Sequence, residues 1–248
     1  MEKPIESLRA AITLPNDVGY LNWASQGIIP DEALKAGDGL LRLRGRTDVD
    51  IVAHEFAATA TARELAARLI DATPDDICLT TNTSIGVNLS AQAIPFEPGD
   101  ELLILRSEFP ANLVPWLNLQ KKGVKIRYIE SKSPDLMLES LEAQVGPKTR
   151  AVSLSFVQFY DGFKHDLTAI GGFCRERGLY FAVDAMQGLG ACPLSVKESK
   201  IDLLSCGGAK WLAAPYGTGF CYFGERLMEI IDWMPSHGWL AYDYSKGD

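Results

Sequence analysis

Lys210 is the residue whose surroundings best suit covalent chemistry. It follows a predicted strand at 201–206 and two glycines, and it lies between Ala209 and Trp211. Apolar surroundings disfavour the ammonium form of a lysine, so they lower its pKa and free the amine as a nucleophile toward a carbonyl carbon. The alternative interpretation is a surface lysine whose aliphatic stem lies over Trp211.

Asp184 is the second candidate, because an apolar strand predicted at 179–183 ends directly in this acid, with Gln187 three residues further on. A carboxylate at the end of a buried strand needs a cationic partner or several hydrogen-bond donors, since an unpaired buried charge is costly. The alternative is a helix cap for the segment that follows.

Thr83 and Ser84 form the third candidate site. They follow a strand predicted at 77–81, and a helix is predicted to begin near Ser84. Free backbone N–H groups, the positive end of the helix dipole and two hydroxyls together suit a phosphate group. An ordinary N-terminal cap made by threonine or serine is the alternative.

Together these motifs provide a phosphate site, a buried carboxylate and a nucleophilic lysine, each next to the end of a strand. Pyridoxal phosphate requires this set: an amine for its aldehyde, a helix N-terminus for its phosphate, and an acid that keeps its ring nitrogen protonated. The sequence therefore predicts a pyridoxal-phosphate site that includes Lys210, Asp184, Thr83 and Ser84.

The elements that must position these residues are short apolar runs alternating with helical segments. Such runs are typical of strands that are covered on both faces, and strand–helix–strand repeats favour right-handed crossovers. The fold class is therefore predicted to be α/β, with a mainly parallel seven-stranded sheet and helices on both faces, and with its chemistry at the carboxyl ends of the strands. The predicted strands are 77–81, 101–105, 124–129, 151–156, 179–183, 201–206 and 219–223.

Two of the intervening segments have clear helix signals. The alanine-rich segment 54–71 carries Leu65 and Leu69 one turn apart. A second helix is predicted from Ser133 as N-cap and Pro134 in the first turn. Its apolar face is predicted to consist of Leu138, Leu141 and Val145.

Composition limits the classes of function. The chain has 248 residues, a formal net charge of −8 and 47% hydrophobic residues, which is typical of a globular protein of one large domain or two small ones. An acidic chain has no positive field for a nucleic-acid backbone or an anionic membrane, so we expect neither partner. We find no signal peptide or membrane-spanning run, and therefore expect a cytoplasmic protein.

Cysteine and histidine give no sign of a metal site. The five cysteines are scattered without a CxxC spacing, which predicts reduced thiols and neither a disulfide framework nor a structural zinc. His54, His165 and His237 are far apart in sequence and show no HxH or HExxH spacing, so no metal ligands are predicted.

These motifs resemble the class V aminotransferases of fold type I, a family that includes cysteine desulfurases and isopenicillin N epimerase. The segments TTNTSIGVNL, FAVDAMQG and GGAKWLAAPYGTGF resemble the phosphate turn, the Asp-Ala-x-Gln signature and the Schiff-base segment. The resemblance implies that Thr83 and Ser84 hold the phosphate, Asp184 the pyridine nitrogen and Gln187 the phenolic oxygen. It makes Lys210 the Schiff-base lysine.

Two further segments extend the resemblance. RSEFPANLVPW resembles the segment whose aromatic residue stacks on the cofactor ring, which implies this role for Phe109. VSLSFVQFYDGF resembles the strand and turn that present a polar side chain to the ring oxygen or the substrate. Gln158 is the best match for that side chain, and Phe159 takes the position if the alignment shifts by one residue.

Three positions depart from the family pattern. The family often has serine and histidine where this chain has Gly207 and Ala209, and desulfurases usually have histidine at the position of Phe109. One phosphate hydroxyl and two imidazoles are therefore absent, which weakens a desulfurase interpretation.

The resemblance also sets an expectation for domains. We interpret residues 1–248 as the pyridoxal-phosphate-binding large domain with an N-terminal segment 1–30, and expect the C-terminal small domain of the family to be absent or truncated after residue 248. In relatives that domain supplies the arginine for the substrate carboxylate. Arg150 and Arg226 are not expected to replace it, and Arg226 is expected on a solvated helix face. A chain without the small domain is expected to dissolve poorly.

The function predicted from these residues is a pyridoxal-phosphate enzyme acting on an amino acid as its small-molecule substrate, as a transaminase or a related lyase or epimerase. The alternatives are a cysteine desulfurase or selenocysteine lyase, and a truncated non-catalytic relative. A cofactor-free Schiff-base lyase ranks last, because it has no use for Asp184 or the phosphate turn. The resemblance further implies a homodimer in which the turn at 217–219 approaches the partner's cofactor phosphate.

Overall fold

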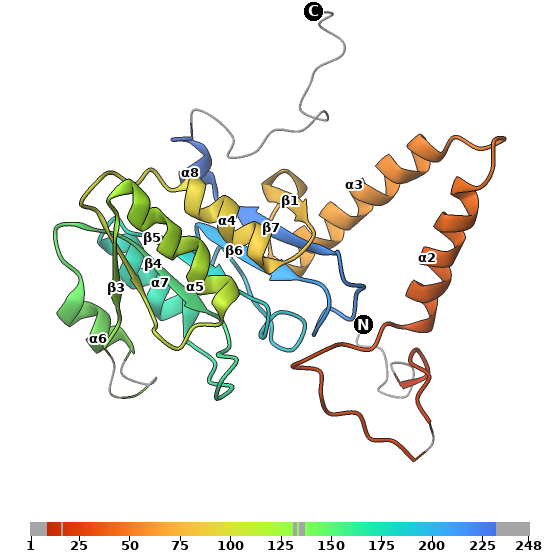
Figure 1. Cartoon of the computed structure of the whole chain (residues 1–248), viewed down its shortest axis with the longest axis horizontal. Coiled ribbons are helices and arrows are strands. Elements are labelled where there is room, and N and C mark those ends of the chain that lie inside the picture. Colours follow the sequence, from red (N-terminus) through yellow and green to blue (C-terminus); the bar gives the residue numbers. More distant parts are fainter. Residues whose placement is uncertain (1–8, 16, 131–132, 134–136, 232–248) are drawn as a thin grey trace, which may run out of the picture.

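The seven apolar runs form one sheet in the computed structural model, which describes residues 9–15, 17–130, 133 and 137–231. The strand order is β1-β7-β6-β5-β4-β2-β3, and β7 alone runs antiparallel to its two neighbours (Figure 1). The predicted α/β class with a mainly parallel sheet is confirmed. The strands are β1 (Ile77–Thr80), β2 (Glu101–Ile104), β3 (Lys125–Tyr128), β4 (Thr149–Ser155), β5 (Tyr180–Asp184), β6 (Leu203–Gly207) and β7 (Gly219–Phe223).

Helices cover both faces of the sheet, because successive strand residues point to opposite sides. Phe181 and Val183 pack with α3, α6 and α7, whereas Ala182 between them packs with α4 and α5. The helices are α2 (Asp31–Arg44), α3 (Ile51–Ile70), α4 (Thr83–Ala93), α5 (Pro110–Leu117), α6 (Met137–Gln144), α7 (Leu167–Glu176) and α8 (Glu225–Met228), with 3-10 turns at Pro74–Asp76 and Asn118–Lys122.

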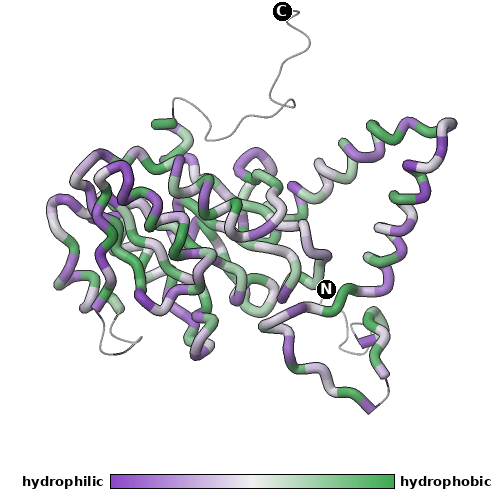
Figure 2. The backbone as a smooth tube through the Cα atoms, in the orientation of Figure 1, coloured by the Kyte–Doolittle hydropathy of each residue, from purple (hydrophilic) through white to green (hydrophobic). Residues whose placement is uncertain are grey.

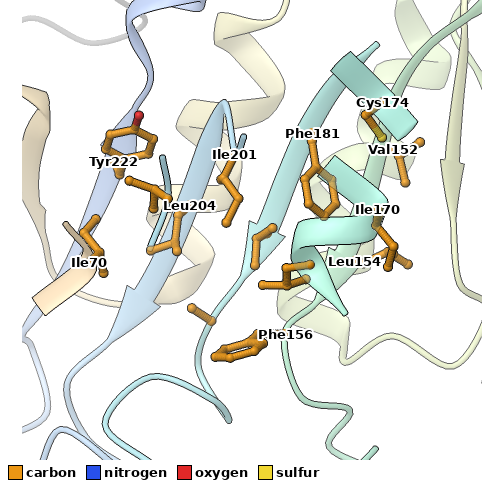
Figure 3. Close-up of a cluster of buried hydrophobic side chains, with 14 of the residues drawn as sticks. Ile70, Val152, Leu154, Phe156, Ile170, Cys174, Phe181, Ile201, Leu204 and Tyr222 are labelled. Carbon is orange, nitrogen blue, oxygen red and sulfur yellow. The ribbon is translucent and has the colours of Figure 1, made fainter. Parts of the chain in front are cut away.

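The larger hydrophobic cluster lies on the α3, α6 and α7 side (Figure 3). Leu154, Phe181 and Leu204 of three adjacent strands are fully buried there, next to Ile170 of α7. Truncating one such leucine to alanine costs about 2–5 kcal/mol, because it removes apolar contacts and leaves a cavity. This packing fixes the strands whose ends carry the site.

Helix α3 begins at Ile51, three residues before the predicted start. The Asp50 side chain accepts a hydrogen bond from the Ala53 backbone N–H at 3.0 Å and so caps the first turn. The buried side of α3 contains Ala66 and Ile70, whereas Leu65 and Leu69 are exposed.

The helix predicted from Ser133 is described from Met137 to Gln144, as α6. Pro134 lies outside the described residues. The buried side chains of α6 are Met137 and Leu141, and Leu138, predicted on the apolar face, is 39% exposed. Val145 follows the end of the helix and packs against the core.

Helices α2 and α3 extend away from the sheet, and apolar residues recur along both (Figures 1 and 2). No residue of α2 is buried, and Leu34 and Leu41 on this helix are exposed. Within the described ranges, no helix is long and apolar enough to cross a membrane.

The ends of several strands meet at one edge of the sheet. Ser155 at the end of β4 pairs in register with Asp184 at the end of β5, and Asp184 pairs with Ser205 of β6. Gly219 at the start of β7 lies between Thr80 of β1 and Gly207 of β6. This edge is where a mainly parallel sheet places its ligands.

Candidate functional site

A pocket of about 190 Å³ lies at this edge of the sheet. Its walls come from the start of α4, the segments that follow β2, β4, β5 and β6, and the turn before β7. Six of the seven site residues predicted from sequence line it: Thr83, Ser84, Phe109, Asp184, Gln187 and Lys210.

Lys210 enters the pocket from the segment after β6. Its Nζ lies 5.6 Å from the centroid of the Phe109 ring. Burial lowers the pKa of Lys210, and the negative charge of Asp184 opposes this effect. The side chain is therefore an amine held in an apolar pocket, and it does not lie on the open surface.

Asp184 is only 4% exposed. Its Oδ1 accepts a hydrogen bond from the Met186 backbone N–H at 2.8 Å. The pKa of Asp184 is raised to about 7, mainly by burial and in smaller part by the nearby charge of Glu108, whereas the Met186 hydrogen bond and Lys210 act in the opposite direction. A carboxyl group in this state is suited to a ligand that brings a positive charge or an N–H donor.

The N-terminus of α4 forms the opposite part of the pocket. The Asn82 side chain caps the helix by accepting a hydrogen bond from the Ile85 N–H at 3.0 Å. Thr83 Oγ1 accepts one from the Gly207 N–H at 2.9 Å, so its hydroxyl proton is left for another acceptor. Ser84 lies in the same turn and also lines the pocket.

Gly207 and Gly208 keep space open at two parts of the pocket. A Cβ atom on Gly208 would lie 2.4 Å from Thr218 Oγ1, and one on Gly207 would lie 3.1 Å from Thr83 Oγ1. A side chain at Gly207 would fill the room beside the helix N-terminus, and one at Gly208 would meet Thr218 and Ala214.

The residues of this pocket fit pyridoxal phosphate. A helix N-terminus with two hydroxyls suits the phosphate, the depressed pKa of the Lys210 amine suits the aldehyde, and the raised pKa of Asp184 suits the ring nitrogen. The exposed ring of Phe109 provides an apolar face beside Lys210.

Gln158, the seventh predicted site residue, lies behind the pocket and is not among the residues that line it. Its Nε2 donates to Glu108 Oε1 at 2.8 Å, and its Oε1 has no partner among the described residues. The next residue, Phe159, lines the pocket and packs edge-on against Phe109, with 5.1 Å between ring centroids. The sequence left Gln158 and Phe159 open for this position, and of the two it is Phe159 that lines the pocket.

Gln187 joins the pocket to the N-terminal segment. Its Nε2 donates to the Ala24 carbonyl at 2.9 Å, and its Oε1 accepts from Trp211 Nε1 at 2.9 Å. The Trp211 ring also stacks against Trp23, with centroids 6.4 Å apart. Gln187 therefore positions backbone and indole groups, in addition to lining the pocket.

Glu108 is a buried residue next to the pocket that was not predicted from the sequence. It is 4% exposed and accepts hydrogen bonds from three neighbouring residues. Its place directly before Phe109 was the available signal, but nothing in the local sequence distinguishes a buried glutamate from a solvated one.

Arg226 is not on a solvated face, so this expectation was wrong. Its guanidinium donates to both carboxylate oxygens of buried Asp202, at 2.9 and 2.7 Å, and to the Leu179 carbonyl. Neither Arg226 nor Arg150 is among the described residues that line the pocket.

All five cysteines are free thiols. In the part of the chain that the structure describes, no group of three or more His, Cys, Asp and Glu side chains could hold a metal ion. His237 lies outside the described residues.

Residues 29–239 match the family model named Aminotransferase class-V, and the chain belongs to this family. Enzymes of the family use pyridoxal phosphate. A probable cysteine desulfurase of Pyrococcus abyssi is 30% identical over 236 residues, which cover 92% of this chain and 58% of that protein.

Solved structures agree with the family assignment. The apo structure of a cysteine desulfurase from Thermococcus onnurineus superposes with a TM-score of 0.85 at 25% identity, covering 96% of this chain and 61% of the other. A C-DES variant with glycine covalently linked to its PLP cofactor superposes at 0.80 and 25% identity, covering 90% and 61%. The chain thus spans about three-fifths of the length of these relatives.

Proposed function

We propose that this chain forms the cofactor-binding part of a pyridoxal-phosphate enzyme that reacts at the α-carbon of an amino acid. The observation that carries this proposal is the presence of Lys210 and Asp184 in one pocket, with their pKa values shifted toward the neutral amine and the protonated acid. The N-terminus of α4 supports it further, because it provides the phosphate site that the same cofactor needs.

Each pocket residue would have a defined task. When bound, the cofactor withdraws electrons from the substrate's α-carbon. Thr83 and Ser84 would hold the phosphate, Asp184 would hold a proton against the ring nitrogen, and Phe109 would fix the ring plane. Lys210 would bind the aldehyde and then, once displaced by the substrate amine, move the proton at the α-carbon.

Two candidates remain for the substrate and its reaction. The names of the relatives support cysteine as the substrate, with sulfur removal as the reaction. The Phe109 side chain in the pocket, at a position where desulfurases usually have histidine, supports transamination or a lyase or epimerase reaction. A selenocysteine lyase reaction falls under the first candidate.

The first experiment compares the absorption spectrum of the chain with that of Lys210→Ala, each incubated with pyridoxal phosphate. We expect a violet band that borohydride fixes covalently in the wild type and that the variant lacks, because only an amine at this position can bond to the aldehyde. Lys200→Ala is the matched control, since Lys200 is exposed and does not line the pocket. Identical spectra for the wild type and Lys210→Ala would favour the non-catalytic relative.

The band then identifies the substrate. Addition of cysteine, alanine or another small amino acid should shift it only where the amino acid displaces Lys210. Sulfide release with cysteine would support the desulfurase candidate, whereas keto-acid formation without sulfide would support transamination.

We also propose a homodimer in the cytoplasm. The exposed apolar residues of α2 and α3, helices that extend away from the sheet, support an interface between two copies. Five free thiols support a reducing compartment.

A further inference from the structure

Glu108 lies at the centre of a hydrogen-bond cluster behind the pocket. Its Oε1 accepts from the Ser155 backbone N–H at 2.9 Å and from Gln158 Nε2 at 2.8 Å. Its Oε2 accepts from Asn112 Nδ2 at 3.0 Å and from the Ser155 hydroxyl. Four donors surround one carboxylate, so this buried charge is well satisfied.

The donors come from three separate elements, which Glu108 joins. Asn112 belongs to α5, Ser155 ends β4, and Gln158 lies in the segment after β4. All three are buried, and Asn112 is itself fixed because its Oδ1 accepts from Trp116 Nε1 and from the Ser153 hydroxyl. Replacing this carboxylate would leave several buried donors without their acceptor at once.

This cluster touches the cofactor pocket on two sides. Ser155 lines the pocket and pairs in register with Asp184, and Glu108 precedes Phe109 in the chain. Gln158 is followed by Phe159, the aromatic partner of Phe109. The residues that Glu108 holds are therefore those directly behind the acid and the aromatic wall of the pocket.

We propose that Glu108 is a positioning residue of the pocket: by holding Ser155 and Gln158 with its carboxylate, it places Phe109 and Phe159 over the cofactor site and sets the electrostatic environment of Asp184. This inference rests on the proposed function, because the ring that these groups would face is that of the proposed cofactor. Its effect on Asp184 exists in the cofactor-free chain and can be measured there.

The charged and titratable groups that act with Asp184 are Glu108, Lys210 and Cys206. Glu108 favours the protonated form of Asp184, and Lys210 favours the ionised form. Glu108→Gln is expected to lower the midpoint of the Asp184 titration by about one pH unit, because it removes a nearby like charge. The midpoint is measured from the carboxyl carbon shift of Asp184 in 13C-aspartate-labelled protein and assigned with Asp184→Asn.

Asp202→Asn is the matched control, because Asp202 is an equally buried acid that accepts from Phe181 N–H and Arg226 on another part of the sheet. It should lower thermal stability without moving the midpoint of Asp184. Glu108→Gln should also weaken pyridoxal phosphate binding about tenfold, because Ser155 and Gln158 lose the ionised acceptor that holds them. Asp202→Asn should bind the cofactor as the wild type does.

Glu108→Asp separates the charge from the reach of the side chain, and it carries the test if Glu108→Gln does not fold. It keeps a negative charge but is one methylene shorter, so the Asp184 midpoint should stay near the wild-type value while cofactor binding weakens. The proposal is overturned if neither variant changes the midpoint or the affinity, or if Asp202→Asn changes them equally. A shifted Asp184 midpoint without any Lys210-dependent band would uphold the action of Glu108 on Asp184 and reject the proposed function.

Discussion

At the scale of single residues, Asp184 and Lys210 illustrate how burial prepares two groups for the same ligand. Burial raises the pKa of the acid and lowers that of the amine, so each is displaced toward its neutral form. Their mutual attraction opposes both shifts but does not cancel them. A cofactor that supplies an aldehyde and a ring nitrogen would satisfy both groups.

The raised pKa of Asp184 predicts a pH dependence of stability for the cofactor-free chain. Between the ordinary pKa of 3.8 and about 7, the folded state holds a proton that the unfolded state has released. Stability that Asp184 contributes at low pH is therefore lost as the pH rises through this window, by roughly 1 kcal/mol per pH unit. Asp184→Asn should not show this loss in urea unfolding measured from pH 4 to 8.

Asp75→Asn is the control for this measurement, because the Asp75 side chain is exposed. Its unfolding free energy should follow that of the wild type across the same pH range. If Asp184→Asn and the wild type had the same pH slope, Asp184 would not hold its proton in the folded chain.

The sequence predicted the site at the level of motifs, because strand ends in a parallel sheet share one edge. Lys210, Asp184 and Thr83 come from different parts of the chain and line one pocket for that reason. Glu108 was missed because its burial depends on donors from β4 and α5, which are distant in sequence. The choice between Gln158 and Phe159 depended on a one-residue register, which local sequence does not determine.

At the scale of elements, the N-terminal segment is bound closely to the segment that carries Lys210. The Gly27 N–H donates to the Ala209 carbonyl at 2.8 Å, and a Cβ atom on Gly27 would lie 1.9 Å from the Lys210 carbonyl oxygen. Only glycine allows the two backbones this approach.

Gly27→Ala is therefore expected to separate the two segments. We expect a loss of about 1–3 kcal/mol in stability and weaker binding of pyridoxal phosphate, because the added methyl group must displace backbone. Tryptophan fluorescence should report the separation, since Trp23 and Trp211 stack between these segments. Gly19→Ala is the control, because nothing lies within 4 Å of its Cβ position; equal effects of both variants would contradict the prediction.

The strands were easier to predict than the helix limits. Continuous apolar runs determined all seven strands, but the antiparallel direction of β7 was not predicted. It follows from the connection between Gly207 and Gly219, which contains no helix and is short for a parallel crossover. Helix α3 begins earlier than predicted because Asp50 provides the cap, a signal present in the sequence but not used.

At the scale of the whole molecule, α2 and α3 present apolar side chains to solvent. Leu41 on α2 is 71% exposed, and no residue of this helix is buried. A helix with an apolar side and no buried residue is typical of a surface that another chain covers.

Leu41→Glu is expected to shift the protein from dimer to monomer, because it places a charge in the proposed interface. Light scattering coupled to size exclusion measures the mass over a range of concentrations. Leu138→Glu is the control, since Leu138 is exposed on α6, at the other end of the molecule from α2 (Figure 1). A wild-type monomer at every concentration would reject the homodimer.

The contact between Gln187 and Ala24 also has a consequence for the order of events during synthesis. The two residues are 163 positions apart, so the N-terminal segment cannot dock until most of the chain has left the ribosome. At about 5–20 residues per second, that delay is roughly ten to thirty seconds. Strand β1 likewise stays unpaired until its partner β7 has been synthesised. The apolar residues of the segment around Ala24 therefore remain uncovered during translation, and this is the period in which a chaperone would bind them.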